Sequence, residues 1–446
     1  MRRVLIITYY WPPSGGSGVQ RWVKFAKHLP AFGWQPVIYT PENPEMPALD
    51  TSLEAEVPEI AEVIRTHISE PYAIYHKFAG KKAEGKGAGL NPINFQKKSL
   101  KQRLMLWIRS NLFVPDPRIS WVKPSVKFLR KYLKKHPVDV IVTTGPPHSM
   151  HLIGLGLRKK LDTPWVADFR DPWTKMFYFK HLGLGRRALK KHLALEKAVL
   201  AGADAVISVS PLVRDDFAAA SAAIAAELAG APGSKAAASA ATPVHLITNG
   251  FDADDFVAPL PGRKDNSFRI VHTGLFASDG NPLELWDALA AKCAEDSEFG
   301  DRLHIVFAGK VDGEIVEAVR KRGLGCHLEL PGYLSHDRSV ELLRTADLIL
   351  LPLRQDPEYR KVLPGKIFEC IAAGHPVLGI GQSDGAAAKI LEDTATGQMF
   401  EWEDRAGIAS FIDGVYEGRV KADGKGVQEY SREALTAKLV ALFESL

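Results

Sequence analysis

The feature that most constrains this chain is a repeated alternation of short, continuous apolar segments with amphipathic ones. Residues 4–8 form an apolar run of strand length, apolar residues at helical spacing follow between residues 19 and 29, and a second apolar run occupies residues 36–40. Continuous apolar runs are typical of strands that are buried on both faces of a parallel sheet. The first 40 residues therefore predict a β-α-β unit.

The alternation continues to about residue 248 and begins again near residue 262. Strands that alternate with helices build a parallel α/β sheet, and 446 residues are too many for one core. We therefore predict two α/β domains, at residues 1–252 and 253–428, with an insertion at about residues 42–113 of the first. The further strands that the pattern predicts are residues 138–144, 164–167, 205–210, 245–248, 268–273, 304–308, 328–330, 347–353 and 377–380.

Polar residues follow the predicted strands at the edge where open α/β sheets bind ligands. Asp168, Arg170 and Asp171 come directly after one strand, and His148 comes after another. Two acids beside an arginine can orient a hydroxyl group and stabilise a departing phosphate, so these residues are catalytic candidates. The alternatives are an Arg–Asp pair that only fixes the turn, and a histidine that only supports its loop.

A glycine-rich loop, Gly15-Gly16-Ser17-Gly18, joins the first predicted strand to the first helix. Backbone N–H groups at the start of a helix bind anions, so Gly15 and Gly16 are candidates for contact with a phosphate or a substrate. The loop is not the dinucleotide-binding GxGxxG fingerprint, because Arg21 stands where the third glycine would fall. The alternative is that the glycines only permit a tight turn.

A second candidate site lies in residues 364–379. A Pro-Gly turn precedes a predicted helix at residues 366–373, and Gly374 ends that helix. Glu369 is an acid within this otherwise small and apolar helix, and a buried carboxylate without a partner is costly. Two interpretations stay open: a local cap or salt bridge, or a carboxylate that accepts hydrogen bonds from the hydroxyl groups of a ligand.

Positive charge is concentrated between residues 77 and 135, where sixteen Lys and Arg accompany two acids. Residues 42–96 predict an irregular segment, because Pro, Gly, Lys and Glu are frequent in them. Residues 97–113 predict an amphipathic helix with one basic face and one apolar face that includes Trp107. Such a helix is typical of contact with an anionic membrane, and the alternative is a surface helix packed on its domain. We expect no nucleic-acid partner, because the tract lacks interleaved aromatic residues.

The composition excludes several other classes of protein. No stretch approaches the roughly 18 apolar residues of a membrane span, and the apolar run near residue 4 is too short for a signal peptide. Neither a CxxC pattern nor an acidic cluster indicates a metal or redox site. We therefore expect a cytoplasmic protein without a bound metal or another cofactor. The three widely spaced cysteines are Cys293, Cys326 and Cys370.

Six short motifs follow one another along the chain, at residues 10–18, 203–210, 249–252, 331–334, 346–347 and 364–377. In this order they resemble the motifs of the GT-B glycosyltransferases, and the best match is the family-4 type of retaining, nucleotide-sugar-dependent enzyme. The resemblance covers nearly the whole chain. It implies two Rossmann-like α/β/α domains that face a central cleft, and a C-terminal helix at residues 429–446 that crosses back to the N-terminal domain.

The resemblance also implies roles for individual residues. Glu369 matches the second acid of the E-x7-E motif of the family, which holds the ribose hydroxyls of the nucleotide. The first acid of that motif contacts the donor sugar, and Lys361 stands in its place here. The alternative for Lys366 and Lys310 is a lysine that is merely exposed. The other donor-binding residues that the resemblance implies are Gly15, Gly16, Lys310, Tyr333, Leu334, Gly365, Lys366 and Ile367.

The implied reaction moves a sugar from a nucleoside diphosphate sugar to a hydroxyl of a saccharide or lipid-linked acceptor, with retention of configuration. The implied setting is synthesis of cell-envelope polysaccharide or glycoconjugate, on the cytoplasmic side of the membrane. Two alternatives stay open. One is a GT-B-like sugar-nucleotide epimerase, which needs no acceptor. The other is a non-catalytic partner that binds the nucleotide sugar, and it is motivated by Lys361.

Overall fold

The structure, a computed structural model, describes residues 1–46, 49–69, 100–176, 178–230, 240–260 and 265–446. The chain divides into two compact units. Unit 1 comprises Met1–Thr248 together with Thr436–Leu446, and unit 2 comprises Asn249–Leu435. The domain boundaries predicted from the sequence, after residue 252 and before residue 429, differ from these limits by a few residues.

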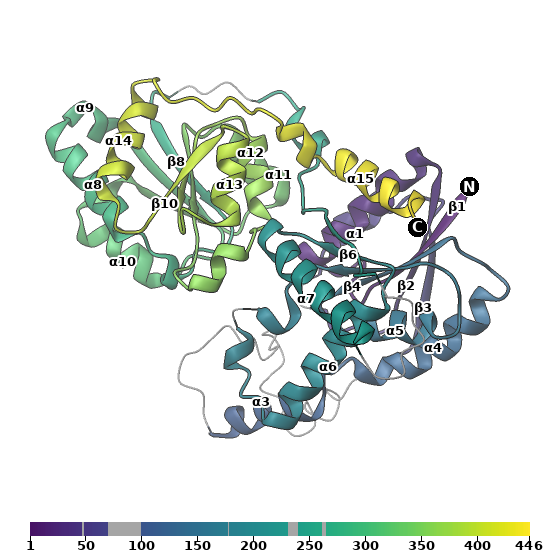
Figure 1. Cartoon of the computed structure of the whole chain (residues 1–446). Coiled ribbons are helices and arrows are strands. Elements are labelled where there is room, and N and C mark those ends of the chain that lie inside the picture. The colour runs from purple at the N-terminus through teal and green to yellow at the C-terminus, as the bar shows by residue number, and fades with distance from the viewer. Residues whose placement is uncertain (47–48, 70–99, 177, 231–239, 261–264) are drawn as a thin grey trace. The chain divides into compact units, whose positions relative to one another are not determined.

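Unit 1 is built on a sheet of seven strands in the order β3-β2-β1-β4-β5-β6-β7, and every neighbouring pair is parallel. Helices cover both faces of this sheet (Figure 1). The strands are β1 (Arg2–Ile7), β2 (Trp34–Pro41), β3 (Glu62–Thr66), β4 (Val140–Gly145), β5 (Trp165–Phe169), β6 (Ala205–Ser208) and β7 (Val244–Leu246).

The helices of unit 1 pack apolar side chains on the sheet, and their core includes the fully buried rings of Trp165 and Phe169. The last residues of the chain join this unit, where the ring of Phe443 lies 5.2 Å from that of Trp34. The α-helices are α1 (Ser17–His28), α3 (Leu100–Leu112), α4 (Ile119–Leu133), α5 (Ser149–Arg158), α6 (Arg186–Gly202), α7 (Pro211–Ala229) and the part of α15 (Arg432–Glu444) from Thr436 onward. Short 3-10 helices are η1 (Leu29–Phe32), η2 (Thr51–Glu56), η4 (Trp173–Lys175) and η5 (Phe179–His181).

The prediction that residues 42–96 are irregular is wrong for β3, which pairs with β2 and forms the edge of the sheet. An edge strand has a neighbouring strand on one side only and is partly open to water, so it tolerates polar residues and lacks a continuous apolar run. β3 carries Glu62 and Arg65, and none of its five residues is fully buried. The part of the predicted segment at residues 70–96 lies outside the described residues.

Unit 2 repeats the plan with six parallel strands in the order β10-β9-β8-β11-β12-β13. The strands are β8 (Phe268–Thr273), β9 (Leu303–Ala308), β10 (Leu328–Gly332), β11 (Leu348–Pro352), β12 (Val377–Ile380) and β13 (Gly397–Phe400). The α-helices are α8 (Leu283–Glu295), α9 (Ser297–Arg302), α10 (Gly313–Lys321), α11 (His336–Arg344), α12 (Lys366–Ala372), α13 (Ala386–Asp393) and α14 (Arg405–Tyr416). Short 3-10 helices are η6 (Ala253–Phe256), η7 (Ser278–Gly280), η8 (Leu324–His327), η9 (Pro357–Lys361) and η10 (Val427–Tyr430).

Each sheet has one place where the strand order reverses, between β1 and β4 in unit 1 and between β8 and β11 in unit 2. Loops that leave the carboxyl ends of two such strands diverge to opposite faces and leave room for a ligand between them. The predicted fold class, two Rossmann-like α/β domains, is confirmed by these sheets. The loops after β1, β4, β8 and β11 are therefore the places in which to look for a site.

Candidate functional site

In unit 1, Arg170 connects the two loops at the point where the strand order reverses. Its side chain donates from Nη1 to the carbonyl of Gly18 (2.5 Å), from Nη2 to that of Pro146, and from Nε to that of Gly145 (3.4 Å). Gly16, at the start of α1, has φ = 104°, a conformation that favours glycine. Arg170 therefore fixes the predicted glycine-rich loop against the loop that carries His148.

Asp168 lies inside unit 1, where its carboxylate accepts four hydrogen bonds. Arg21 donates to it from Nε (3.3 Å) and from Nη2 (3.0 Å), and both side chains have an exposed fraction of 0%. The indole of Trp22 and the hydroxyl of Thr144 each donate to Oδ2 at 2.8 Å. The same Arg21 also donates to the carbonyls of Thr248 (2.6 Å) and Ile247 (2.9 Å). The pair thus joins α1, β4, β5 and the end of β7.

Burial raises the pKa of Asp168. The charge of Arg21 and the donated hydrogen bonds lower it by more than burial raises it, so the pKa of Asp168 lies below its ordinary value. The sequence predicted that β5 ends at residue 167, which would place Asp168 on a loop. The strand in fact continues to Phe169, so Asp168 is a residue of the sheet and its side chain points into the core. The geometry favours the structural alternative stated above, in which this carboxylate holds an arginine.

Asp171 differs from Asp168, because its side chain is partly exposed and has no hydrogen bond with any described residue. Burial raises the pKa of Asp171, while the charge of Arg170 lowers it. Of the two predicted acids, Asp171 is the one that retains the capacity to accept a hydrogen bond from a substrate.

His148 stacks on Trp173, with ring centroids 4.6 Å apart and an interplanar angle of 3°. Its Nδ1 atom is buried and has no hydrogen-bond partner among the described residues. Burial lowers the pKa of His148 well below its ordinary value, and the neighbouring His151, Arg170 and His192 lower it further, so the ring is neutral. Trp173 was not among the predicted site residues, although it lies only five residues after Asp168.

In unit 2, Glu369 lies one turn inside α12, at the edge where the loops after β8 and β11 leave the sheet. Its side chain is partly buried and makes no hydrogen bond to any described residue. Burial raises the pKa of Glu369; among its neighbours, His336 and Arg432 lower it and Asp255 raises it. A local cap or salt bridge, which the sequence left open, is thus absent from the described residues.

Lys366 reaches the end of β8, where its Nζ lies 3.4 Å from Nε2 of His272. The other ring nitrogen of His272, Nδ1, lies 3.1 Å from the carbonyl of Leu350 and must be its donor, so Nε2 is left to accept from Lys366. Burial lowers the pKa of Lys366 to about 8, against smaller opposing effects of Cys370 and Glu369. Lys366 is therefore a half-buried cation at the point where the strand order reverses, not the merely exposed lysine of the alternative interpretation.

Close backbone contact shapes the same edge of the sheet. Gly309 has φ = 119°, and a Cβ atom there would lie 2.3 Å from the carbonyl oxygen of Gly274. Lys310, the next residue, is exposed, as is Tyr333, with an exposed fraction of 93%, whereas Leu334 is partly buried. All three lie just beyond the carboxyl ends of β9 and β10.

The remaining predicted residues of α12 differ in what they offer a ligand. Gly365 is exposed at the start of the helix. The amide of Ile367 donates to the carbonyl of Pro364 (3.0 Å) and its side chain is fully buried, so this residue supports the turn. Lys361, in the place of the first acid, lies 3.6 Å from Glu358 within η9.

Two residues of this region were missed by the sequence analysis. His336, which begins α11, lies with Nε2 2.8 Å from Asp255, and both lie near Glu369. His272, at the end of β8, was not among the predicted site residues. A contact such as that of Lys366 with His272 joins residues 94 positions apart, and it follows from the strand order and not from any local pattern.

Among the described residues, no group of three or more His, Cys, Asp or Glu is arranged to hold a metal ion. None of the described helices combines the length and the apolar composition needed to cross a membrane.

Comparison with known proteins gives one family match. Residues 94–225, less than a third of the chain, match the model of Glycosyltransferase Family 4. No curated protein matches the sequence.

The fold of the whole chain is found in solved structures. Sucrose-phosphate synthase from Thermosynechococcus elongatus is 16% identical with a TM-score of 0.59, covering 100% of this chain and 99% of the other. The lipopolysaccharide outer core galactosyltransferase WaaB is 12% identical with a TM-score of 0.55, covering 100% of each chain. The trehalose-6-phosphate protein from E. coli bound with UDP-2-fluoro glucose is 13% identical with a TM-score of 0.56, covering 99% of this chain and 95% of the other. By fold over the whole chain, and by the family model over residues 94–225, the chain thus resembles the GT-B glycosyltransferases of the family-4 type.

Proposed function

We propose that the chain transfers a sugar from a nucleoside diphosphate sugar to an acceptor hydroxyl, with retention of configuration. The observation that carries the proposal is the Glu369 carboxylate, which lies at the ligand-binding edge of the unit 2 sheet and makes no hydrogen bond to a described residue. A carboxylate has two oxygens and can accept from two neighbouring hydroxyl groups, as the ribose of a nucleotide presents them.

Lys366 supplies the charge that such a donor needs. Its ammonium is positioned by His272, and a cation in a partly desolvated place binds a diphosphate more strongly than one in water. When the glycosidic bond to the donor breaks, negative charge grows on the leaving diphosphate, and a fixed cation stabilises that charge. One turn of α12 separates Lys366 from Glu369, so one short helix would hold both the diphosphate and the ribose of a nucleoside diphosphate.

We assign the acceptor to the residues of unit 1 that retain free capacity at the corresponding edge. Asp171 is the carboxylate available to orient a hydroxyl, and Arg170 and His148 shape the loops beside it. The setting that we propose is envelope polysaccharide or glycoconjugate synthesis on the cytoplasmic face of a membrane, and it is supported by the likeness to the fold of a lipopolysaccharide galactosyltransferase.

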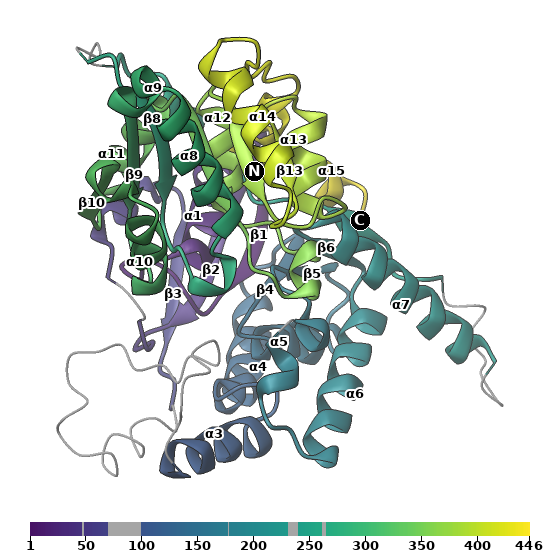
Figure 2. The ribbon, with the colours of Figure 1, turned by 90° about the vertical axis from the view of Figure 1, so that its left-hand side faces the viewer.

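A membrane contact fits one surface of unit 1. On α3, Leu104, Trp107 and Leu112 are exposed by 58%, 49% and 63%. Helix α3 contacts α6 (Figure 2), on which Leu189 and Leu193 are also exposed. The exposed cations beside these apolar side chains are Arg103, Arg186, Arg187, Lys190 and Lys191. Apolar side chains among cations suit the interface of an anionic bilayer, and we assign the predicted membrane contact of residues 97–113 to this surface.

The donor assignment is tested by measuring the thermal midpoint of the protein with UDP-, GDP-, ADP- and TDP-sugars. We expect at least one donor to raise the midpoint, and Glu369→Gln to weaken that donor about 10- to 100-fold, because the substitution removes the negative charge and replaces one of the two acceptor oxygens by an NH2 group. Glu392→Gln, at an exposed acid paired with Lys389, is the matched control and should bind as the wild type does. If no nucleotide sugar stabilises the protein, or if Glu369→Gln binds normally, the donor assignment fails.

The same donor then separates the alternatives. An epimerase converts it with no acceptor present, and a non-catalytic partner binds it without any turnover.

Membrane contact is tested by flotation with phosphatidylglycerol vesicles. Leu104→Ser with Trp107→Ser should reduce binding, while Leu228→Ser with Leu330→Ser, at exposed leucines elsewhere, should not. Equal binding by both double variants would contradict the proposed surface.

A further inference from the structure

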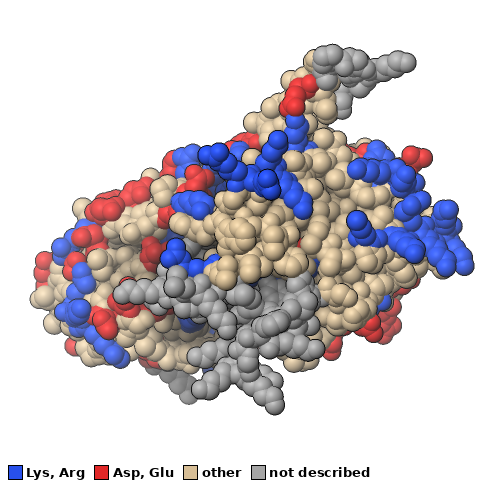
Figure 3. Space-filling view, turned by 90° about the horizontal axis from the view of Figure 1, so that it is seen from below, with Lys and Arg blue, Asp and Glu red and all other residues tan. Residues whose placement is uncertain are grey.

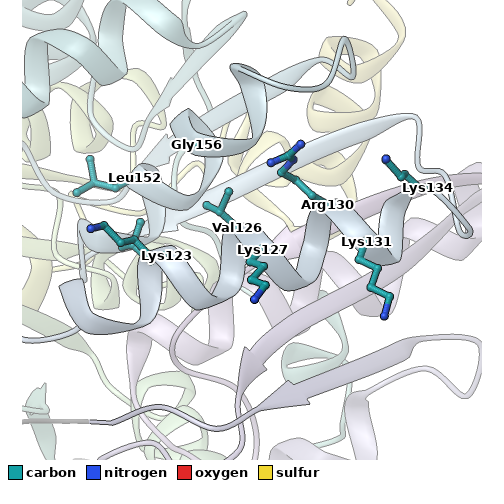
Figure 4. Close-up of a pocket in the computed structure, with 9 residues that line it drawn as sticks. Lys123, Val126, Lys127, Arg130, Lys131, Lys134, Leu152 and Gly156 are labelled. Carbon is teal, nitrogen blue, oxygen red and sulfur yellow. The ribbon is translucent and has the colours of Figure 1, made fainter.

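A groove of about 570 Å³ lies between α4 and α5 on the outside of unit 1 (Figure 4). Helix α4 contributes four cations to it and the C-cap residue Lys134 a fifth, and Val122, Val126, Leu152 and Gly156 complete the lining. A Cβ atom on Gly156 would lie 2.7 Å from a methyl group of Val126, so the two helices meet closely beneath the cations. The volume lies within the range of small-molecule sites. The cations are Lys123, Lys127, Arg130, Lys131 and Lys134.

The spacing of these cations gathers them on one side of α4. Each residue of an α-helix advances about 100°, so all five fall within a stripe roughly 100° wide. Among the described residues, no Asp or Glu lines the groove, and α4 and α5 contain no acid along their length. None of the five makes an ion pair with a described residue. Lys and Arg gather along the side of the molecule where α4 lies (Figure 3).

Like charges four residues apart on a helix repel one another, and Lys123, Lys127 and Lys131 form such a row. The repulsion weakens α4, and within the described structure no carboxylate relieves it. A bound anion would relieve it, and Arg130 can hold two oxygens of one phosphate at once. The apolar floor beside the cations favours a ligand that carries a non-polar part next to its charges.

We propose that the α4–α5 groove is a binding site for a ligand with two or more phosphate groups, separate from the donor site of unit 2. Five cations can balance that much charge, and a site on the outer face of the helices lies away from the sheet edges where the strand order reverses. The phosphate groups have two sources: a soluble phosphorylated compound, or the headgroups of an anionic lipid.

The test compares the wild type with the groove variant Lys127→Gln/Arg130→Gln/Lys131→Gln. Tripolyphosphate, matched in ionic strength by NaCl, should raise the thermal midpoint of the wild type and should bind the groove variant at least tenfold more weakly. The matched control Arg320→Gln/Lys421→Gln/Lys425→Gln loses the same charge from exposed residues of unit 2 and should behave as the wild type does. The proposed donor should bind all three proteins equally, so a failure of this site is distinct from a failure of the donor site.

A second arm separates the two sources. Vesicles of phosphatidylglycerol and of phosphatidylcholine are compared by flotation with the same three proteins. Loss of the tripolyphosphate effect alone in the groove variant supports a soluble ligand, and loss of vesicle binding in the groove variant supports lipid headgroups. If the groove variant matches the control variant in both arms, or if neither probe binds the wild type, the proposal is overturned.

Discussion

Replacing Asp168 by Asn tests whether this residue supports the fold or faces a substrate. The substitution keeps the shape of the side chain and removes its charge, which leaves the guanidinium of Arg21 fully buried without its counter-ion. Breaking a buried ion pair by removing one partner costs about 3–5 kcal/mol in the free energy of unfolding. For a unit of this size, about 2–4 °C of the thermal midpoint corresponds to each kcal/mol, so we expect the midpoint to fall by about 6–20 °C.

The measurement is thermal and urea unfolding followed by tryptophan fluorescence. Asp215→Asn is the matched control, because Asp215 pairs with Arg214 at an exposed position and its loss should cost within about 0.5 kcal/mol. The double variant Arg21→Met/Asp168→Asn should be less destabilised than Asp168→Asn alone, since no unpaired charge then stays in the core. If Asp168→Asn unfolds at the same midpoint as Asp215→Asn, the structural role is refuted.

The pKa of Asp168 adds a dependence on pH. Because the folded pKa lies below the unfolded value, the ionised carboxylate contributes its full stability above the unfolded pKa of about 3.9. That contribution is lost as the pH falls through the folded pKa. The difference in stability between the wild type and Asp168→Asn should therefore shrink in acid, and a constant difference across that range would contradict the ion pair.

Four further predictions concern Lys366, Asp171 and two glycines of unit 2. Donor affinity, measured by calorimetry, should fall as the pH rises through about 8, where Lys366 loses its charge, and Lys366→Met should be weaker and show no such step. In the absence of donor, Lys366 has a pKa of about 8 in the folded protein and of 10.5 in the unfolded chain, so between these pH values the unfolded chain binds more protons than the folded protein. The stability of the wild type relative to Lys366→Met should therefore rise with pH over that window. Asp171→Asn should leave the midpoint within about 1 °C and lower turnover tenfold or more, and unchanged turnover would remove it from the acceptor site. Gly309→Ala should lose about 1–3 kcal/mol or more of the free energy of unfolding, because its Cβ would meet the carbonyl of Gly274. Gly313→Ala, with open space around its Cβ at the start of α10, should gain up to about 1 kcal/mol. Equal changes in the free energy of unfolding of the two variants would contradict the close approach to Gly274.

The sequence predicted most of the fold because the buried strands of a parallel sheet carry a local signal. The apolar run at residues 377–380 coincides with β12, and the helix before it begins at Lys366 as expected. The signal fails at the edge of a sheet, and β3 was missed for that reason. Strand ends are also weakly specified, and a difference of two residues at the end of β5 decides whether Asp168 points into the core or lies on a loop.

The candidate site could be predicted only in part. Glu369 and Lys366 stand out because one short helix carries an acid and a cation among small apolar residues. Their partners do not stand out, because His272 and His336 come from other segments and meet α12 through the strand order. The groove on α4 was visible only as an excess of charge, since the sequence indicates which face of a helix is apolar but not which other helix that face meets.

The last residues of the chain complete the first unit. Leu439, Val440 and Phe443 are buried in unit 1, and Glu444 pairs with Arg2 at the other end of the chain. During synthesis, N-terminal domains usually fold before the rest of the protein has left the ribosome. Here the apolar surface around Trp34 stays uncovered until the final residues have emerged. Unit 1 therefore reaches its native state only after unit 2 has been synthesised, and loss of a few C-terminal residues would impair the domain that was made first.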